Sequence, residues 1–180
     1  CIPVPALDVL RSLKTYALFT SKGAVANAAT SGIVGNIGTH DGIVGGFETS
    51  TQVGSTYPVG VETARAVLDL DSAYNDLISL PNDVLDHTPA FGSGETLTTG
   101  VYYTAGAGSL AGTITLDGQN DPSAKFVFKF NGAFSVAAGS RVILINGASR
   151  CNVFWISEGA LSMGTFVYMK GTALAHGGAC

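Results

Sequence analysis

Val101-Tyr102-Tyr103, Val127-Phe128-Lys129 and Val153-Phe154-Trp155 are three aromatic segments that begin 26 residues apart, at positions 101, 127 and 153. A sequence period of about 20–50 residues is typical of proteins built from stacked structural repeats. Valine and aromatic residues are enriched in β-strands. These segments therefore predict one strand of a repeating coil.

Two further segments recur with nearly the same step. Residues 132–136 return 27 residues later as 159–163, with glycine, alanine and serine in matching positions. Residues 113–118 match 141–147, and 170–177 match them more loosely. Three short strands per coil predict a mainly β fold, a three-sided β-solenoid.

Alternation along these strands separates inward from outward side chains. We expect Leu110, Phe134, Val136, Leu161 and Met163 to point inward. The outward positions are Ser109, Ala111, Ala133, Ser135, Ala160 and Ser162. They predict a flat surface strip of small, uncharged side chains.

The residues ahead of the repeat divide into two regions. Short apolar pieces separated by glycines fill residues 15–47, a pattern typical of tight turns. We interpret residues 1–55 as N-terminal coils and 96–180 as the main coils of a single domain, residues 1–180. Residues 82–96 read as the connecting loop.

Residues 58–80 predict one long helix, because their apolar side chains recur at helical spacing. The apolar positions are Val61, Ala64, Val67, Leu68, Leu70, Tyr74, Leu77 and Ile78, and the polar face contains Glu62, Arg65, Asp69, Asp71 and Asp76. We expect Thr56 to cap the helix and Pro81 to end it, since proline disfavours helical geometry in the preceding residue. The helix is long enough to lie along several coils.

Composition excludes several classes of protein. The chain has 180 residues, of which 12% are charged, and its formal net charge is −4. This charge lacks the basic surface that nucleic-acid binding requires, so nucleic acid is not an expected partner. No run of about 18 apolar residues is present, so we expect no membrane-spanning segment.

Cysteines occur at Cys1, Cys151 and Cys180, and their pairing cannot be read from the sequence. Cys1 is either one half of a terminal bridge, which we favour, or a lipid-modified residue. Cys151 opens a predicted buried strand. We expect it to be an inert core residue, because free cysteine behaves as a small hydrophobe.

Polar residues give no convergent catalytic or metal site. We interpret His40, His87 and His176 as solvated turn histidines, because they lack metal-ligand spacing. Asp117, Asn120 and Asp121 share one loop that could hold calcium, but turn capping explains them equally well. The charged residues of the repeat are isolated: Lys125, Lys129, Arg141, Arg150 and Glu158. No carboxylate pair recurs at coil spacing, so we expect neither an enzyme nor a cofactor.

Aromatic residues of the repeat have two readings. Phe128, Phe130, Phe154 and Trp155 could form a platform for stacking sugars. Repeating aromatics in a solenoid are more often internal, and we assign Phe128 and Phe154 to the core.

Residues 92–102 (GSGETLTTGVY), 111–119 (AGTITLDGQ) and 151–155 (CNVFW) resemble the DUF3494 ice-binding proteins, and the likeness runs from about Thr15 to the end of the chain. The resemblance implies a right-handed, discontinuous β-solenoid in which early coils stack on late ones, with the helix alongside. It also implies a flat face that orders water in an ice-like array.

This chain departs from the family pattern in two ways. Active members carry threonine on the ice face, whereas the matching positions here are Ala133, Ser135, Ala160 and Ser162. Serine keeps the hydroxyl but lacks the methyl group. Family domains also continue for several strands beyond residues 170–175, so the chain is either part of a longer protein or completed by a neighbouring subunit.

The sequence thus predicts a secreted or cell-surface, non-enzymatic protein that adsorbs to ice through the small-residue strip. The alternative is a structural or adhesive module, such as a filament subunit that pairs with homo-oligomer neighbours through the solenoid ends. Open strand edges recruit such partners.

Overall fold

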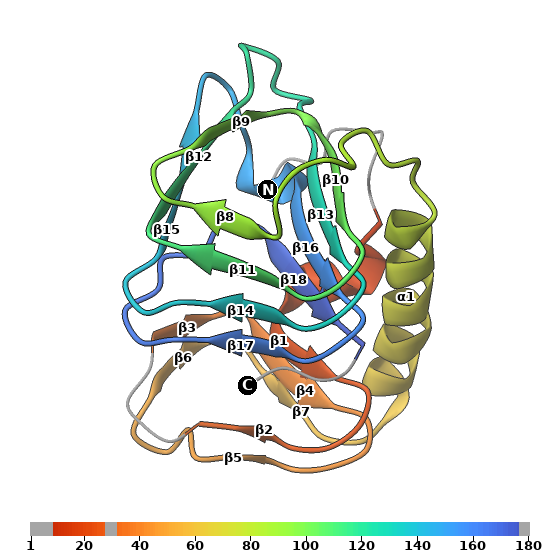
Figure 1. Cartoon of the computed structure of the whole chain (residues 1–180). Coiled ribbons are helices and arrows are strands. Elements are labelled where there is room, and N and C mark those ends of the chain that lie inside the picture. The colour runs from red at the N-terminus through yellow and green to blue at the C-terminus, as the bar shows by residue number, and fades with distance from the viewer. Residues whose placement is uncertain (1–8, 28–31, 177–180) are drawn as a thin grey trace. The chain divides into compact units, whose positions relative to one another are not determined.

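The computed structural model describes residues 9–27 and 32–176 (Figure 1). These residues form two compact units, an N-terminal unit of residues 9–76 and a C-terminal unit of residues 77–176.

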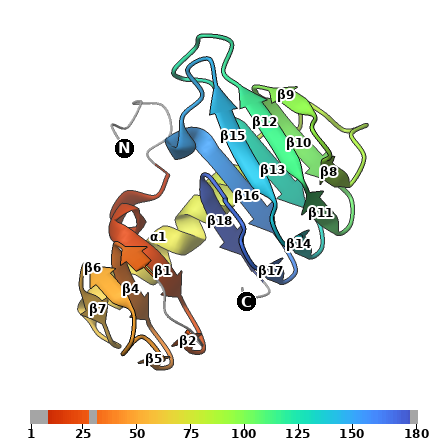
Figure 2. The same ribbon diagram turned by 90° about the vertical axis from the view of Figure 1, so that its left-hand side faces the viewer.

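Parallel strands of the C-terminal unit form three sheets, one for each side of the coil (Figures 1 and 2). Sheet A contains β10 (Gly100–Thr104), β13 (Phe126–Phe130), β16 (Val153–Ser157) and β18 (Thr172–Ala175). Sheet B contains β8 (Ala90–Gly92), β11 (Gly108–Ala111), β14 (Phe134–Val136) and β17 (Leu161–Met163). Sheet C contains β9 (Thr96–Thr98), β12 (Thr113–Asp117) and β15 (Arg141–Ile145). The predicted three-sided solenoid is confirmed.

Aromatic rings stack through the inside of sheet A. The ring of Phe128 lies 5.2 Å from Tyr102 and 4.1 Å from Trp155, nearly parallel to both. Phe128 and Phe154 are both buried, as predicted, but the 26-residue spacing does not give their register: Val127 is the partner of Phe154, and Phe128 that of Trp155. A short 3-10 helix, η2 (Arg150–Asn152), precedes β16, and this coil is one residue longer than the coil before it. Phe154 is buried, but on the opposite face of the sheet.

Inward side chains of sheet B agree with the predicted alternation, with one exception. Leu110, Phe134, Val136 and Leu161 are buried. Met163, on β17 at the end of sheet B, is 40% exposed.

Residues 170–177 were expected to form a third-side strand, and this expectation is wrong for the described part. Thr172–Ala175 is β18, which pairs with β16 in sheet A. Sheet C ends instead on a single bridge between Arg141 and Tyr168. The remainder, Gly177, lies outside the described residues.

Glycine permits close stacking where the chain turns from sheet A to sheet B. A Cβ atom on Gly132 would lie 2.7 Å from the backbone nitrogen of Ala107, and one on Gly159 would lie 2.7 Å from that of Ala133. Side chains essentially never approach backbone this closely. Glycine at these corners therefore lets successive coils lie directly on one another.

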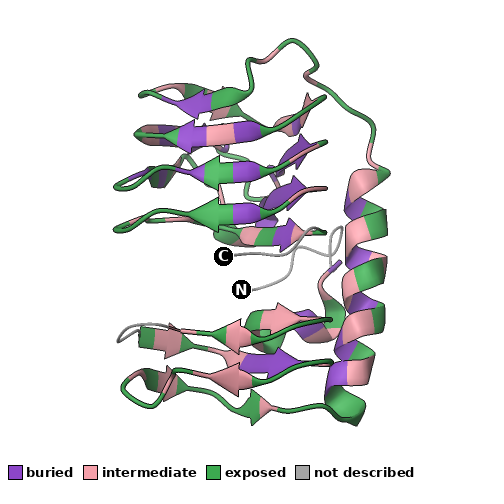
Figure 3. Ribbon diagram, turned by 60° about the horizontal axis from the view of Figure 1, so that its bottom comes forward, coloured by how far each residue is buried: buried purple, intermediate pink, exposed green. Residues whose placement is uncertain are grey.

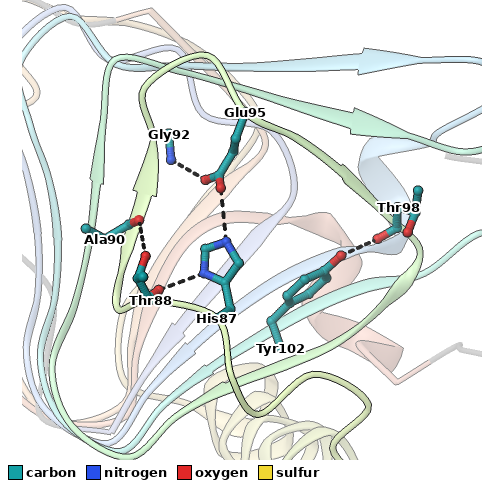
Figure 4. Close-up of polar contacts among 7 residues, drawn as sticks. All are labelled: His87, Thr88, Ala90, Gly92, Glu95, Thr98 and Tyr102. Atoms are coloured by element: carbon teal, nitrogen blue, oxygen red, sulfur yellow. Dashed lines mark hydrogen bonds and ion pairs between the residues drawn. The ribbon is translucent and has the colours of Figure 1, made fainter.

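A cap covers the first coil of the C-terminal unit. Val84 bridges β10, and the Asp83 carboxylate accepts a hydrogen bond from the Val101 amide at 2.9 Å. The His87 ring stacks on Phe91 at 4.2 Å, and its nitrogens face Thr88 O at 2.7 Å and Glu95 Oε2 at 3.0 Å (Figure 4). His87 is therefore not the solvated turn histidine that was expected, because its ring packs on the buried ring of Phe91.

Lys129 is buried, not isolated as the sequence predicted. Its Nζ donates hydrogen bonds to Ile78 O at 3.0 Å, to Leu80 O, and to Asn82 Oδ1 at 3.0 Å. Burial lowers the pKa of this ammonium group. Because the last carbonyls of a helix lack intrahelical partners, a cation there stabilises the helix end.

Cys151 is disulfide-bonded, so the expectation of an unpaired core cysteine is wrong. It is half-buried in the middle of η2, ahead of β16. The expected bridge at Cys1 and the position of Cys180 lie outside the described residues.

Short strands, as the glycine-rich sequence predicted, build the N-terminal unit. A 3-10 helix, η1 (Arg11–Thr15), precedes a sheet of β1 (Tyr16–Thr20), β4 (Asn36–Thr39) and β7 (Thr56–Tyr57). The two-stranded sheets contain β2 (Val25–Ala26) with β5 (Val44–Gly45), and β3 (Gly32–Val34) with β6 (Thr51–Val53). All described pairs are parallel, as coils require.

The predicted helix is α1 (Val61–Ile78), and Figure 3 shows buried and exposed residues alternating around it. Its cap differs from the prediction: Thr56 lies in β7, and the Thr63 hydroxyl accepts a hydrogen bond from the Gly60 amide at 2.9 Å. The buried face also differs. Leu68 is 69% exposed, whereas Asp69 is buried. Two hydrogen bonds explain this burial, since Ser12 donates to Asp69 Oδ2 from Oγ at 2.5 Å and from its amide at 3.2 Å.

Asp69 makes the stability of the N-terminal unit dependent on pH. The hydroxyl of Ser12, above all, lowers the pKa of this carboxyl group. A lowered folded pKa stabilises the fold above the ordinary carboxyl value of about 4, and the contribution is lost as pH falls through the folded pKa. We expect Asp69→Asn to lower the free energy of unfolding by about 1–3 kcal/mol at pH 7 and by much less at pH 2. Urea unfolding at both pH values measures this, with the exposed Asp71→Asn as control. An equal loss at the two pH values would contradict the assignment.

Candidate functional site

One file of side chains runs across the outer face of sheet B. Strand pairing aligns Ala90 with Ser109, Ser109 with Ser135, and Ser135 with Ser162. The four strands follow one another as successive rungs (Figure 1). Since paired strands lie about 4.8 Å apart, the serine hydroxyls repeat at that interval.

Alanine and glycine flank this serine file on both sides. The backbone hydrogen bonds Gly108 N to Ala133 O and Phe134 N to Ala160 O stack Ala133 on Ala160. On the other side, pairing aligns Ala111 with Gly92. We call the set the B face: Ala90, Gly92, Ser109, Ala111, Ala133, Ser135, Ala160 and Ser162. The structure thus brings all six predicted site residues together on one face.

Hydroxyl groups of the B face have no protein partner within the described ranges. Ser109, Ser135 and Ser162 make no side-chain hydrogen bond to other described residues, whereas Ser140 Oγ and Ser157 Oγ donate to backbone carbonyls. Ser135 and Ser162 are exposed and Ser109 is half-buried. The B face therefore offers three aligned hydroxyls to water, among methyl groups and without a charge.

Sheet C presents a second hydroxyl array that the sequence reasoning missed. Thr115 pairs with Thr96 on one side and with Ile143 on the other, and Thr98 pairs with Asp117. The signal was present in two Thr-x-Thr segments, residues 96–98 and 113–115. Charge interrupts this face, because Asp117 and Arg141 lie on it; the Arg141 guanidinium packs 4.5 Å from the Tyr168 ring.

The remaining polar candidates serve turns and strand ends. Asp117 Oδ1 accepts from Gln119 N and Asn146 Nδ2, and Asp121 Oδ1 accepts from Ser123 N and Oγ. The Ser123 hydroxyl lowers the pKa of Asp121. In residues 9–27 and 32–176, no three His, Cys, Asp or Glu side chains gather closely enough to hold a metal ion.

The other two histidines are also bonded. His40 Nδ1 lies 3.2 Å from Thr63 Oγ1, and the exposed His176 lies 3.2 Å from Glu158, so Glu158 is not isolated.

A sugar platform of Phe128, Phe130, Phe154 and Trp155 is excluded because all four side chains are buried. No helix in the described ranges is both long and apolar enough to cross a bilayer.

Comparison with known proteins identifies the class. The family model described as ice-binding-like matches residues 19–179. This chain belongs to that family.

Several named proteins are similar to this chain. An ice-binding protein of Nostoc sp. (strain HG1) is 34% identical over 84% of this chain and 56% of its own length. Ice-binding protein 1 of Shewanella frigidimarina is 40% identical over 59% of this chain and 12% of its own length. The chain therefore spans little more than half of the first relative and a small part of the second.

Solved structures agree in fold. The ice-binding protein of an Antarctic Flavobacteriaceae bacterium superposes with a TM-score of 0.87, at 39% identity over 92% of this chain and 38% of that one. The protein of the Antarctic ascomycete Antarctomyces psychrotrophicus also gives 0.87, at 29% identity, and covers 94% and 86% of the two chains.

Proposed function

We propose that this protein binds ice and that the B face is the surface that adsorbs to it. Family membership supports the activity, since the relatives above are named ice-binding proteins. We choose the B face because Ser109, Ser135 and Ser162 align, one per coil, and their hydroxyls have no hydrogen-bond partner among the described residues. Sheet C is the weaker candidate, because charged side chains hold water in their own geometry.

Adsorption through the B face requires no covalent step. Each hydroxyl can donate one hydrogen bond to ordered water and accept others, while neighbouring alanine methyls pack against water cages. Individual contacts are weak. They add because the face is held by a stacked β core, which loses little conformational entropy on binding.

The structure also supports an extracellular location. The disulfide at Cys151 is a bond that persists in oxidising compartments and is rare in the cytosol. We infer a secreted or cell-surface protein whose partner is ice. The adhesive or filament module is less favoured, because the relatives carry names for ice binding.

Measurement of ice activity in the purified chain tests the proposal directly. We expect inhibition of ice recrystallisation and a measurable thermal hysteresis gap, with faceted crystals inside the gap. Heat-denatured protein at equal concentration is the control. Round crystals and unrestricted recrystallisation with the folded chain would reject ice binding.

A further inference from the structure

A hollow of about 180 Å³ lies in the N-terminal unit, on residues that belong to neither the B face nor sheet C. Different elements supply its walls: Tyr16 from β1, Asn36 from β4, Tyr57 from β7, and Glu62 and Arg65 from α1. It is smaller than the pockets of about 300–1,000 Å³ that enclose drug-sized ligands. Its size suits a single small ring.

Two aromatic rings form one wall of the hollow. The rings of Tyr16 and Tyr57 lie 5.9 Å apart at 52°, and the Phe19 ring packs edge-on against Tyr16 at 5.1 Å. Phe19 supports Tyr16 from β1 and is not part of the lining. The orientation of the Tyr16 ring is therefore set before any ligand arrives.

Polar groups of the hollow have unused hydrogen-bonding capacity within the described ranges. The hydroxyls of Tyr16 and Tyr57 and the carboxylate of Glu62 have no hydrogen-bond partner among the described residues. Asn36 uses only Oδ1, which accepts from Ser55 N at 3.0 Å, so Nδ2 remains available. Arg65 forms an ion pair with Asp69, with Nε 3.9 Å from Oδ2.

These groups also lie close to one another. Burial raises the pKa of the Tyr16 hydroxyl, and the nearby Tyr57 and Glu62 raise it further. Two aromatic hydroxyls, an amide, a carboxylate and a guanidinium thus meet around one small space. The lining carries charges of both signs, the carboxylate of Glu62 and the guanidinium of Arg65, which favours a polar neutral ligand over a phosphate or an ammonium compound.

We propose that this hollow binds one neutral sugar ring, such as a terminal hexose of a surface polysaccharide. The apolar C–H face of the ring would pack on Tyr57 and Tyr16. Its vicinal hydroxyls would donate to Glu62 and accept from Arg65 and Asn36 Nδ2, the donor and acceptor pattern that adjacent hydroxyls require. Such a site is independent of ice binding, and either function can fail alone.

Amide chemical shifts of the full ¹⁵N-labelled chain test the proposal. D-Glucose, D-galactose, D-mannose and N-acetyl-D-glucosamine are each titrated to about 50 mM, since a few hydrogen bonds and one ring face give affinities near the millimolar range. We expect saturable shifts with at least one sugar, confined to the amides of Tyr16, Asn36, Tyr57 and Arg65 and their neighbours.

Two variants make the assignment specific. Glu62→Gln, an exposed position, is expected to weaken binding at least tenfold without loss of fold, and Tyr57→Ala to abolish it. The control is Glu48→Gln, an exposed glutamate of the same unit outside the hollow, which should bind as wild type does. Linear shifts spread over the whole chain with all four sugars, or equal affinity in wild type and Glu62→Gln, would overturn the proposal.

Discussion

Ser135→Tyr is expected to reduce both thermal hysteresis and recrystallisation inhibition to below about one tenth of the wild-type values, because adsorption sums many weak contacts that one projecting ring disrupts together. Ser135 is the middle position of the serine file, with Ser109 and Ser162 as its register partners. Its side chain is exposed, so the fold should tolerate the ring. The two assays at matched protein concentration measure the effect, and circular dichroism verifies the fold.

Thr115→Tyr is the matched control, because Thr115 occupies the corresponding middle position of sheet C. It should retain ice activity. Loss of activity in Thr115→Tyr with retention in Ser135→Tyr would transfer the ice-binding surface to sheet C. Wild-type activity in both variants would show that neither the B face nor sheet C is the ice-binding surface. The family assignment would still hold.

Trp155→Ala is expected to lower the free energy of unfolding of the C-terminal unit by about 3–5 kcal/mol, the usual loss for a large buried aromatic residue. Trp155 is fully buried, its ring stacks on Phe128 at 4.1 Å, and its Nε1 donates to Lys170 O at 3.0 Å. Truncation therefore leaves both a cavity and a carbonyl without its donor. The midpoint temperature of thermal unfolding should fall by roughly 10 °C, since each kcal/mol lowers it by about 2–4 °C at this chain length.

Phe166→Ala is the control for the loss of an aromatic ring, because Phe166 is 84% exposed. Its effect on unfolding should be within about 0.5 kcal/mol. If Trp155→Ala and Phe166→Ala proved equally stable, the stacked rings of sheet A would not be the main source of stability in this unit.

Periodicity in the sequence predicted the three-sided coil of the C-terminal unit, but not the place of β18, which pairs in sheet A. The repeat spacing predicted three sides per coil, and alternation placed Leu110 and Phe134 inward and Ser135 outward. Spacing alone could not resolve one extra residue before β16. Because of that extra residue, Trp155 and not Phe154 stacks on Phe128. A shift of one position reverses the face of every side chain in a strand.

Contacts between distant segments were not predictable from local pattern. Lys129 was considered isolated because its partners, Ile78, Leu80 and Asn82, are about 50 residues away in the sequence. Asp69 was placed on the polar face of the helix because it is charged. The Ser12 hydroxyl that allows its burial is 57 residues away in the sequence. Buried charges of this kind follow from tertiary hydrogen bonding, which periodicity does not encode.

The B face was predictable in part, because its members follow strand alternation. The threonines of sheet C were not predicted as a surface, because the strand register that aligns Thr96 with Thr115 cannot be read from the sequence. We chose between the two faces by their charge and by their hydroxyls without hydrogen-bond partners. Neither property of a face can be assigned until the strand register is known.

The cap on the first coil also restricts how copies of this chain can associate. Val84 already occupies the outer edge of β10, and His87 covers Phe91 beneath it. An endless head-to-tail fibre needs a free pairing edge at both extremities of every molecule. In sheet A, pairing of a second copy with the outer edge of β10 would first require Val84 to be displaced, whereas β8 and β9 are the terminal strands of sheets B and C within the described residues.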